Sequence, residues 1–160
     1  MKAAIYEKSE KSNMNPAGRA EHLSNLGRIY FSMEIYDKAE SFYLEALELL
    51  RESLEKNHPN IGVTLNNLGG LYYLQGHSDR AAALYEQAIA IYEKTLELDH
   101  PYLAILLNNL AEVYKVRGRY REAQVLYNRA LTILEKIAGE ENPYIEMTLP
   151  ARLNVFPSMI

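Results

Sequence analysis

The sequence repeats itself with a period of 42 residues, and this period constrains the possible fold more than any other feature. Pro59, Pro101 and Pro143 are 42 residues apart. The same interval separates the members of six further columns: Asn25, Asn67 and Asn109; Leu26, Leu68 and Leu110; Tyr30, Tyr72 and Tyr114; Ala39, Ala81 and Ala123; Tyr43, Tyr85 and Tyr127; Ala46, Ala88 and Ala130. Self-similarity at a fixed period is typical of stacked repeat proteins, in which each unit buries its apolar face against its neighbours.

The middle unit, residues 59–100, predicts two helices joined by a short turn. Apolar residues recur at helical spacing in both segments: Ile61, Leu65, Leu68 and Tyr72 in the first; Ala81, Leu84, Ala88, Ile91 and Leu98 in the second. Gly76 falls where a left-handed residue commonly ends a helix, and the proline opening each unit suits a first helical position. We therefore expect an all-α solenoid of stacked antiparallel helix pairs, with repeats at 16–58, 59–100 and 101–142.

These units resemble a known repeat family. Leu68, Gly69, Tyr72, Gly76, Ala81, Tyr85 and Ala88 resemble the tetratricopeptide repeat pattern, whose usual period is about 34 residues. The longer unit, with Leu-Asn-Asn-Leu at 65–68 and 107–110 and Leu-Glu-Lys-Asn-His-Pro at 54–59, is similar to the repeats of kinesin light chains and their bacterial relatives. The resemblance covers residues 16–149. It implies a right-handed α-solenoid whose first helices line a concave groove.

Both ends of the chain depart from the period. Residues 1–15 look like part of a second helix, because Ala-Ile-Tyr-Glu-Lys at 4–8 recurs at 90–94. Residues 143–160 open a fourth repeat, but Pro150 falls where its first helix should continue. Three explanations stay open. The ends fold back as caps, or incomplete repeats dock between chains and form a homo-oligomer, or the chain is a fragment of a longer array.

Mapping the chain onto the family pattern places candidate peptide-binding residues on the first helices: Ser24, Asn25, Arg28, Phe31, Asn66, Asn67, Tyr73, Leu74, Asn108, Asn109, Glu112 and Lys115. A side-chain amide offers a donor and an acceptor, so paired asparagines can hold the backbone of an extended peptide. We expect the column of Ser24, Asn66 and Asn108 to face the groove. For the column of Asn25, Asn67 and Asn109, ligand binding and a structural hydrogen bond to the adjacent helix both stay open. Tyr73 should face away from Tyr72 and be the most exposed aromatic residue.

The charges of the first helices limit the ligand. The segment 60–75 contains no charged residue, which disfavours a clamp for a terminal carboxylate. Arg28, Lys115 and Arg117 remain able to receive an acidic or aromatic-acidic segment, the ligand type that the kinesin light chain resemblance implies.

Composition excludes several other functions. A net charge of −4 and a pI near 5.6 argue against nucleic acid as a partner. The chain has no cysteine and no apolar stretch long enough for a membrane span, so we expect a cytoplasmic protein. His58 and His100 precede prolines, where a turn or capping role is favoured over metal binding. We expect no catalytic, cofactor or metal site.

The sequence therefore predicts a non-enzymatic scaffold for protein–protein interaction that binds extended peptides in its concave groove. The alternative is a structural module that self-assembles through its incomplete terminal repeats.

Overall fold

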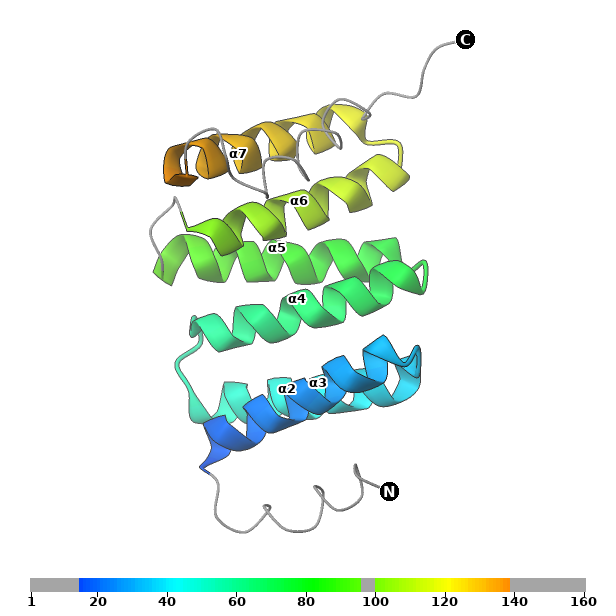
Figure 1. Ribbon diagram of the computed structural model, residues 1–160, viewed down its shortest axis with the longest axis vertical. Coiled ribbons are helices and arrows are strands. Elements are labelled where there is room, and N and C mark those ends of the chain that lie inside the picture. Colours follow the sequence, from blue (N-terminus) through cyan, green and yellow to red (C-terminus); the bar gives the residue numbers. More distant parts are fainter. Residues whose placement is uncertain (1–14, 96–99, 139–160) are drawn as a thin grey trace.

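The computed structural model describes residues 15–95 and 100–138, and all regular structure within them is helical. Six helices follow one another: α2 (Pro16–Ser32), α3 (Tyr36–Ser53), α4 (Pro59–Leu74), α5 (Ser78–Thr95), α6 (Pro101–Val116) and α7 (Tyr120–Ala138). They form three antiparallel pairs, α2 with α3, α4 with α5 and α6 with α7, which stack into an elongated array (Figure 1). The expected all-α solenoid of helix pairs is confirmed.

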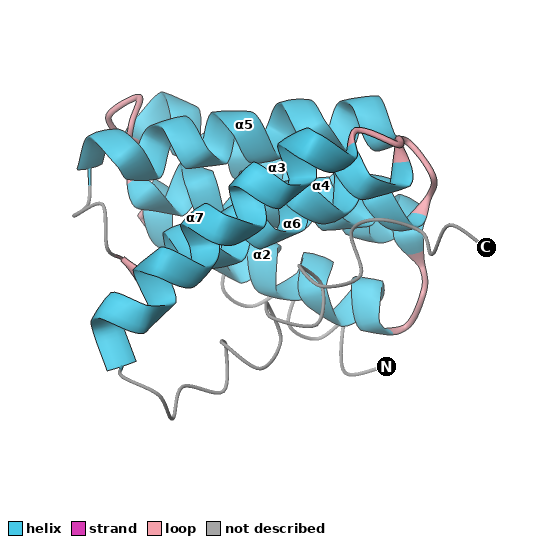
Figure 2. Cartoon of the chain, turned by 90° about the horizontal axis from the view of Figure 1, so that it is seen from above, coloured by secondary structure: helices cyan, strands magenta, loops and turns pink. Residues whose placement is uncertain are grey.

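The array has two layers (Figure 2). Each second helix also packs on the first helix of the next pair, α3 on α4 and α5 on α6. In addition, α4 contacts both α2 and α6, so the first helices form a continuous face of their own. The buried columns fill the space between the layers: Ala39, Ala81 and Ala123, and Ala46, Ala88 and Ala130, are all fully buried. Small residues at these positions let neighbouring helices approach closely.

Each first helix begins at a proline that follows a capping side chain. Asn15 Oδ1 accepts a hydrogen bond from the Gly18 amide at 2.8 Å. His58 Nδ1 accepts one from the Asn60 amide at 3.2 Å, and His100 Nδ1 accepts one from the Tyr102 amide at 3.1 Å. These bonds satisfy amides that have no partner within the helix. The capping role expected for the two histidines is confirmed.

Each first helix also ends in the same way. The amide of His77 donates to the carbonyl of Tyr72. In the other repeats, the amide of Ile35 donates to the carbonyl of Tyr30, and that of Arg119 to the carbonyl of Tyr114. This closure requires a left-handed residue just before the donor. Gly76 and Gly118 fill that position with φ values of 79° and 72°, whereas in the first repeat it falls to Glu34, with φ of 59°.

Replacing Glu34 by glycine is expected to stabilise the protein. The left-handed conformation costs a non-glycine residue about 1–2 kcal/mol, and the greater freedom of glycine in the unfolded chain offsets part of that gain. Glu34→Gly should therefore raise the free energy of unfolding by about 0.5–1 kcal/mol in urea denaturation. The control is Glu48→Gly on the exposed side of α3, which should lower it by about 1 kcal/mol. A loss of stability in Glu34→Gly would contradict the role assigned to this position.

The second helices send one tyrosine each across a small residue of the first helix. A Cβ atom added to Gly27 would lie 2.6 Å from the ring of Tyr43, and one added to Gly69 would lie 2.7 Å from the ring of Tyr85. Tyr127 packs in the same manner with Ala111. The absence of larger side chains at these points allows the tyrosines to span the layer from the second helices to the first.

The predictions about the chain ends concern residues 1–14 and 139–160, which lie outside the described residues. Capping by the ends, a fragment of a longer array and self-association therefore stay predictions. Among the described helices, none is long and apolar enough to cross a membrane.

Candidate peptide-binding groove

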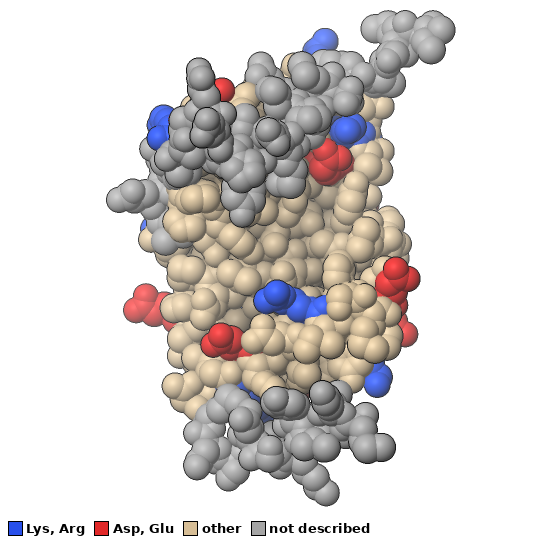
Figure 3. Space-filling view, viewed as in Figure 1, with Lys and Arg blue, Asp and Glu red and all other residues tan. Residues whose placement is uncertain are grey.

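A groove runs along the face formed by the first helices, and we refer to it as the inner groove. Its main depression has a volume of about 630 Å³ and is lined by residues of α2, α4 and α6 and by two tyrosines of the second helices: Asn25, Arg28, Ile29, Phe31, Ser32, Tyr43, Asn66, Asn67, Gly70, Tyr85 and Asn109. A second depression of about 400 Å³ shares Asn25, Arg28 and Asn67 and also includes Ser24. Figure 3 shows this face of the molecule, with few charged side chains across its middle.

Asparagines contribute most of the polar groups in the inner groove. Asn25 is exposed and Asn67 is half-buried. The Asn67 amide makes no hydrogen bond within the described residues. Asn109 instead donates from Nδ2 to Asn66 Oδ1 at 3.0 Å and so joins α6 to α4. Of the column whose role was left open, Asn109 thus makes a hydrogen bond to the adjacent first helix, Asn25 Oδ1 accepts one of 3.5 Å from Arg28 of its own helix, and all three members line the groove together with Asn66.

The structure overturns the expectation for Asn108. Its side chain is only 8% exposed, it does not line the groove, and its Oδ1 atom is buried without a partner among the described residues. Successive residues of an α-helix point about 100° apart. Because Asn109 faces the groove, Asn108 is turned toward the packed interior of the array.

The expectation for Tyr73 is also wrong. The side chain is half-buried and packs against the hydrophobic core, so it is not an exposed anchor in the groove. Burial raises the pKa of its hydroxyl, and the negative charge of nearby Glu112 raises it further. Glu112 belongs to α6, so Tyr73 lies near this neighbouring helix, which a helical wheel of α4 alone does not take into account.

Two residues that sequence reasoning assigned only to the core line the inner groove. Tyr43 and Tyr85 are 2% and 3% exposed, yet both contribute to its surface. Burial raises the pKa of Tyr43 to about 12, although the positive charge of Arg28 opposes this shift. Burial also raises the pKa of Tyr85. Both hydroxyls therefore stay protonated at neutral pH and can donate hydrogen bonds.

A sequence signal for these tyrosines did exist. Tyr43 and Tyr85 recur in phase with Gly27 and Gly69, and a recurring glycine in a helix often marks a close approach by another group. The third member of the column, Tyr127, has a different environment, because its hydroxyl donates to the carboxylate of Glu112.

The cations expected near the ligand differ in their availability. Arg117 forms an ion pair of 2.6 Å with Asp79, and Lys115 lies 3.8 Å from Glu112. Arg28 has no carboxylate partner within the described residues and lines both depressions. The inner groove thus has one available cation, on α2, beside an α4 helix without charge.

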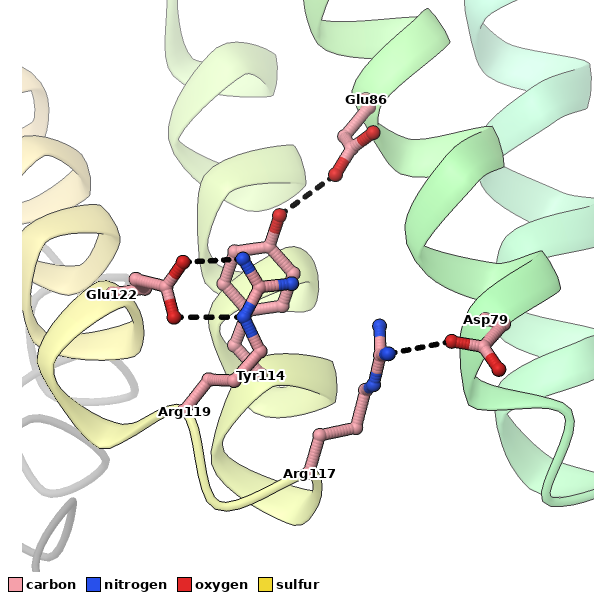
Figure 4. Close-up of polar contacts among 6 residues, drawn as sticks. All are labelled: Asp79, Glu86, Tyr114, Arg117, Arg119 and Glu122. Atoms are coloured by element: carbon pink, nitrogen blue, oxygen red, sulfur yellow. Dashed lines mark hydrogen bonds and ion pairs between the residues drawn. The ribbon is translucent and has the colours of Figure 1, made fainter.

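A separate polar cluster joins the second and third repeats (Figure 4). The Tyr114 hydroxyl donates to Glu86 at 2.7 Å, and the Arg119 guanidinium lies 3.9 Å from the centre of the Tyr114 ring. Arg119 also pairs with Glu122, which stands where the earlier repeats have the cations Lys38 and Arg80 over Tyr30 and Tyr72. In the third repeat, the cation over the tyrosine ring is therefore Arg119, which lies in the turn between α6 and α7 and not on the second helix. This cluster stabilises the junction between repeats.

The structure brings together seven of the predicted site residues in the two depressions: Ser24, Asn25, Arg28, Phe31, Asn66, Asn67 and Asn109. The other five do not line them: Tyr73, Leu74, Asn108, Glu112 and Lys115. Leu74 is 56% exposed at the end of α4. Within the described part of the chain, no group of three His, Cys, Asp or Glu side chains could hold a metal ion.

Comparison with known proteins gives one family. The sequence profile described as tetratricopeptide repeat matches residues 18–94 and 89–136. No curated protein matches the chain.

Solved structures with similar folds include repeat proteins of the kinesin light chain type. BtubC from P. vanneervenii superposes with a TM-score of 0.85 at 24% identity, over 96% of this chain and 61% of that one. A putative kinesin light chain with nearly identical TPR-like repeats from Podosopora anserina gives a TM-score of 0.79 at 24% identity, over 89% and 67% of the two chains. The N-terminal domain of stress-induced protein-1 from C. elegans gives 0.63 at 14% identity, over 87% and 98%. The chain thus spans 61% of the length of BtubC, and these likenesses concern the fold.

Proposed function

Because this chain belongs to the tetratricopeptide repeat family, we propose that it is a non-enzymatic protein-interaction module that binds an extended peptide segment of a protein partner in the inner groove. The observation that carries the proposal is the lining of the main depression, about 630 Å³ in volume, where the Asn67 amide and the hydroxyls of Tyr43 and Tyr85 make no hydrogen bond within the described residues.

The polar groups of the inner groove suit a peptide backbone. Asn67 offers a donor and an acceptor, and Tyr43 and Tyr85 offer hydroxyls. A peptide backbone presents donors and acceptors along its whole length, so such a lining can pair with it largely independently of the peptide side chains. The same groove contains Ile29, which is 54% exposed and offers an apolar contact.

Charge sets one feature of the proposed ligand. Among the described residues, Arg28 is the cation that lines both depressions, Glu21 lines the second one, and no charge occurs on α4. A peptide with one acidic group near α2 and neutral residues over α4 would place its carboxylate beside Arg28 and leave no charge desolvated without a partner.

The proposal can be tested by filling the groove. A Cβ atom added to Gly70 would meet only the Tyr85 hydroxyl, at 3.7 Å, so Gly70→Leu should occupy the groove without disturbing the core. Peptides selected from a displayed random library on the wild-type protein should bind Gly70→Leu at least about tenfold more weakly in calorimetry, a loss of about 1.4 kcal/mol. Asn67→Ala should weaken binding by about 0.5–1.5 kcal/mol, the usual worth of one hydrogen bond.

Val125→Ser is the control, because Val125 is 66% exposed on α7 and lies outside the groove. This variant should bind the selected peptides as the wild type does. If Gly70→Leu retained full affinity for every selected peptide while folding normally by circular dichroism, the inner groove would not be the binding site.

A further inference from the structure

A second groove opens on the side of the second helices, between α3 and α5, and we refer to it as the outer groove. It has a volume of about 520 Å³. Ile61 and Leu65 of α4 form its floor together with Ile91 of α5, and these three residues are 2%, 1% and 8% exposed. Its rim is polar and carries Arg51, Lys56, Gln87 and Lys94.

The charges around the outer groove have one sign. Arg51 lies in the last turn of α3, Lys94 in the last turn of α5, and Lys56 in the connection between α3 and α4. All three are exposed, and none forms an ion pair within the described residues. Among the described residues, no acidic side chain lines the groove. Cations in a last helical turn interact favourably with the helix dipole, but that effect accounts neither for Lys56, which is outside the helices, nor for the apolar floor.

The corresponding position between α5 and α7 shows what the outer groove lacks. Between α5 and α7, Glu93 and Arg129 form an ion pair of 2.6 Å that links the two second helices. One period earlier, the same positions hold Arg51 and Gln87. Gln87 donates from Nε2 to the Ala83 carbonyl of its own helix at 3.2 Å and does not reach across. Within the described residues, no ion pair therefore links α3 to α5 at the outer groove, and Arg51 has no carboxylate partner.

We propose that the outer groove is a second binding site, which takes an acidic peptide segment of a protein partner. An aliphatic or aromatic side chain of that segment enters between α3 and α5 toward Ile61, Leu65 and Ile91, and flanking carboxylates lie beside the cations of the rim. Charge complementarity identifies the ligand, since three cations from three elements line a groove to which the described residues contribute no carboxylate. This site lies on the opposite layer from the inner groove and goes beyond the proposed function.

The same observations disfavour a nucleic-acid backbone. Proteins that track phosphates carry extended basic surfaces, whereas this chain has a net charge of −4 and the cationic rim surrounds an apolar floor. An acidic peptide with an apolar side chain matches both the charge of the rim and the character of the floor.

The test uses a fluorescein-labelled synthetic peptide in which Leu and Phe are flanked on both sides by Glu. Fluorescence anisotropy with the full chain should show saturable binding that weakens as salt is raised, because the contacts at the rim are exposed to solvent. A peptide with Gln in place of Glu, and one with Ser in place of Leu and Phe, should each bind more weakly than the parent peptide.

The decisive variant transfers the ion pair between α5 and α7 to the outer groove. Arg51→Glu combined with Gln87→Arg should link α3 to α5 as Glu93 and Arg129 link α5 to α7. The double variant should weaken peptide binding by at least about tenfold, because it removes the cation of Arg51 and pairs the new arginine with the new glutamate. Arg121→Glu is the control for a charge reversal, because Arg121 is exposed on α7 and does not line the outer groove. This control should bind as the wild type does.

Gly70→Leu separates the two sites. It fills the inner groove and should leave binding of the acidic peptide to the outer groove unchanged. The proposal is overturned if the wild type shows no saturable binding, if the ion-pair variant binds the peptide as well as the wild type, or if Gly70→Leu removes the binding. It is equally overturned if phosphatidylserine vesicles bind at this groove and the peptide does not.

Discussion

Leu68→Ala is expected to lower the free energy of unfolding by about 2–5 kcal/mol, the range for truncating a buried leucine. Leu68 is 1% exposed in the middle of α4, which packs against its own pair and against both neighbouring repeats. The cavity would therefore open at the centre of the array, where the surrounding helices are held on both sides and have little freedom to close it. Urea denaturation followed by circular dichroism measures the effect.

Leu74→Ala provides the matched control, because it makes the same chemical change in the same helix. Leu74 is 56% exposed, so its truncation should alter the free energy of unfolding by no more than about 0.5 kcal/mol. Equal losses in the two variants would show that Leu68 does not occupy the core position assigned to it.

Gly69→Leu should be destabilising by about 3 kcal/mol, at the upper end of the usual cost of overpacking. A Cβ atom at this position would lie 2.7 Å from the ring of Tyr85, and that ring is only 3% exposed and cannot move freely. The third repeat accommodates a single methyl group here, since Ala111 packs with Tyr127. A leucine adds further carbon atoms that neither the ring nor the helix can avoid.

The adjacent glycine should respond in the opposite direction. Gly70→Leu places its side chain toward the inner groove, and replacing glycine by leucine in a helix is favourable by up to about 1 kcal/mol. Thermal unfolding of both variants should therefore give melting temperatures on either side of the wild-type value. A melting temperature of Gly69→Leu equal to that of Gly70→Leu would contradict the close approach of Tyr85 to α4.

The 42-residue period by itself determined the helices and their order. The proline that opens each first helix, the cap before it and the glycine after it act within a few residues, so their effects can be derived from local sequence. The same holds for the columns of alanine and leucine, because a residue that recurs at one position in every repeat meets the same neighbours each time. These features were sufficient for the fold class, whereas the face on which the inner groove lies was implied by the resemblance to tetratricopeptide repeats.

The tertiary structure decided which side chains reach a surface and which pair with one another. Neighbouring asparagines differ by about 100° around a helix, and only the packing of α6 places Asn109 in the groove and Asn108 in the interior. Tyr43 and Tyr85 reach the inner groove because they cross a glycine of another helix. The charges of the outer groove likewise depend on side chains from three elements. Such contacts join residues far apart in the chain, and their geometry follows from how the helices pack and not from the local sequence of either partner.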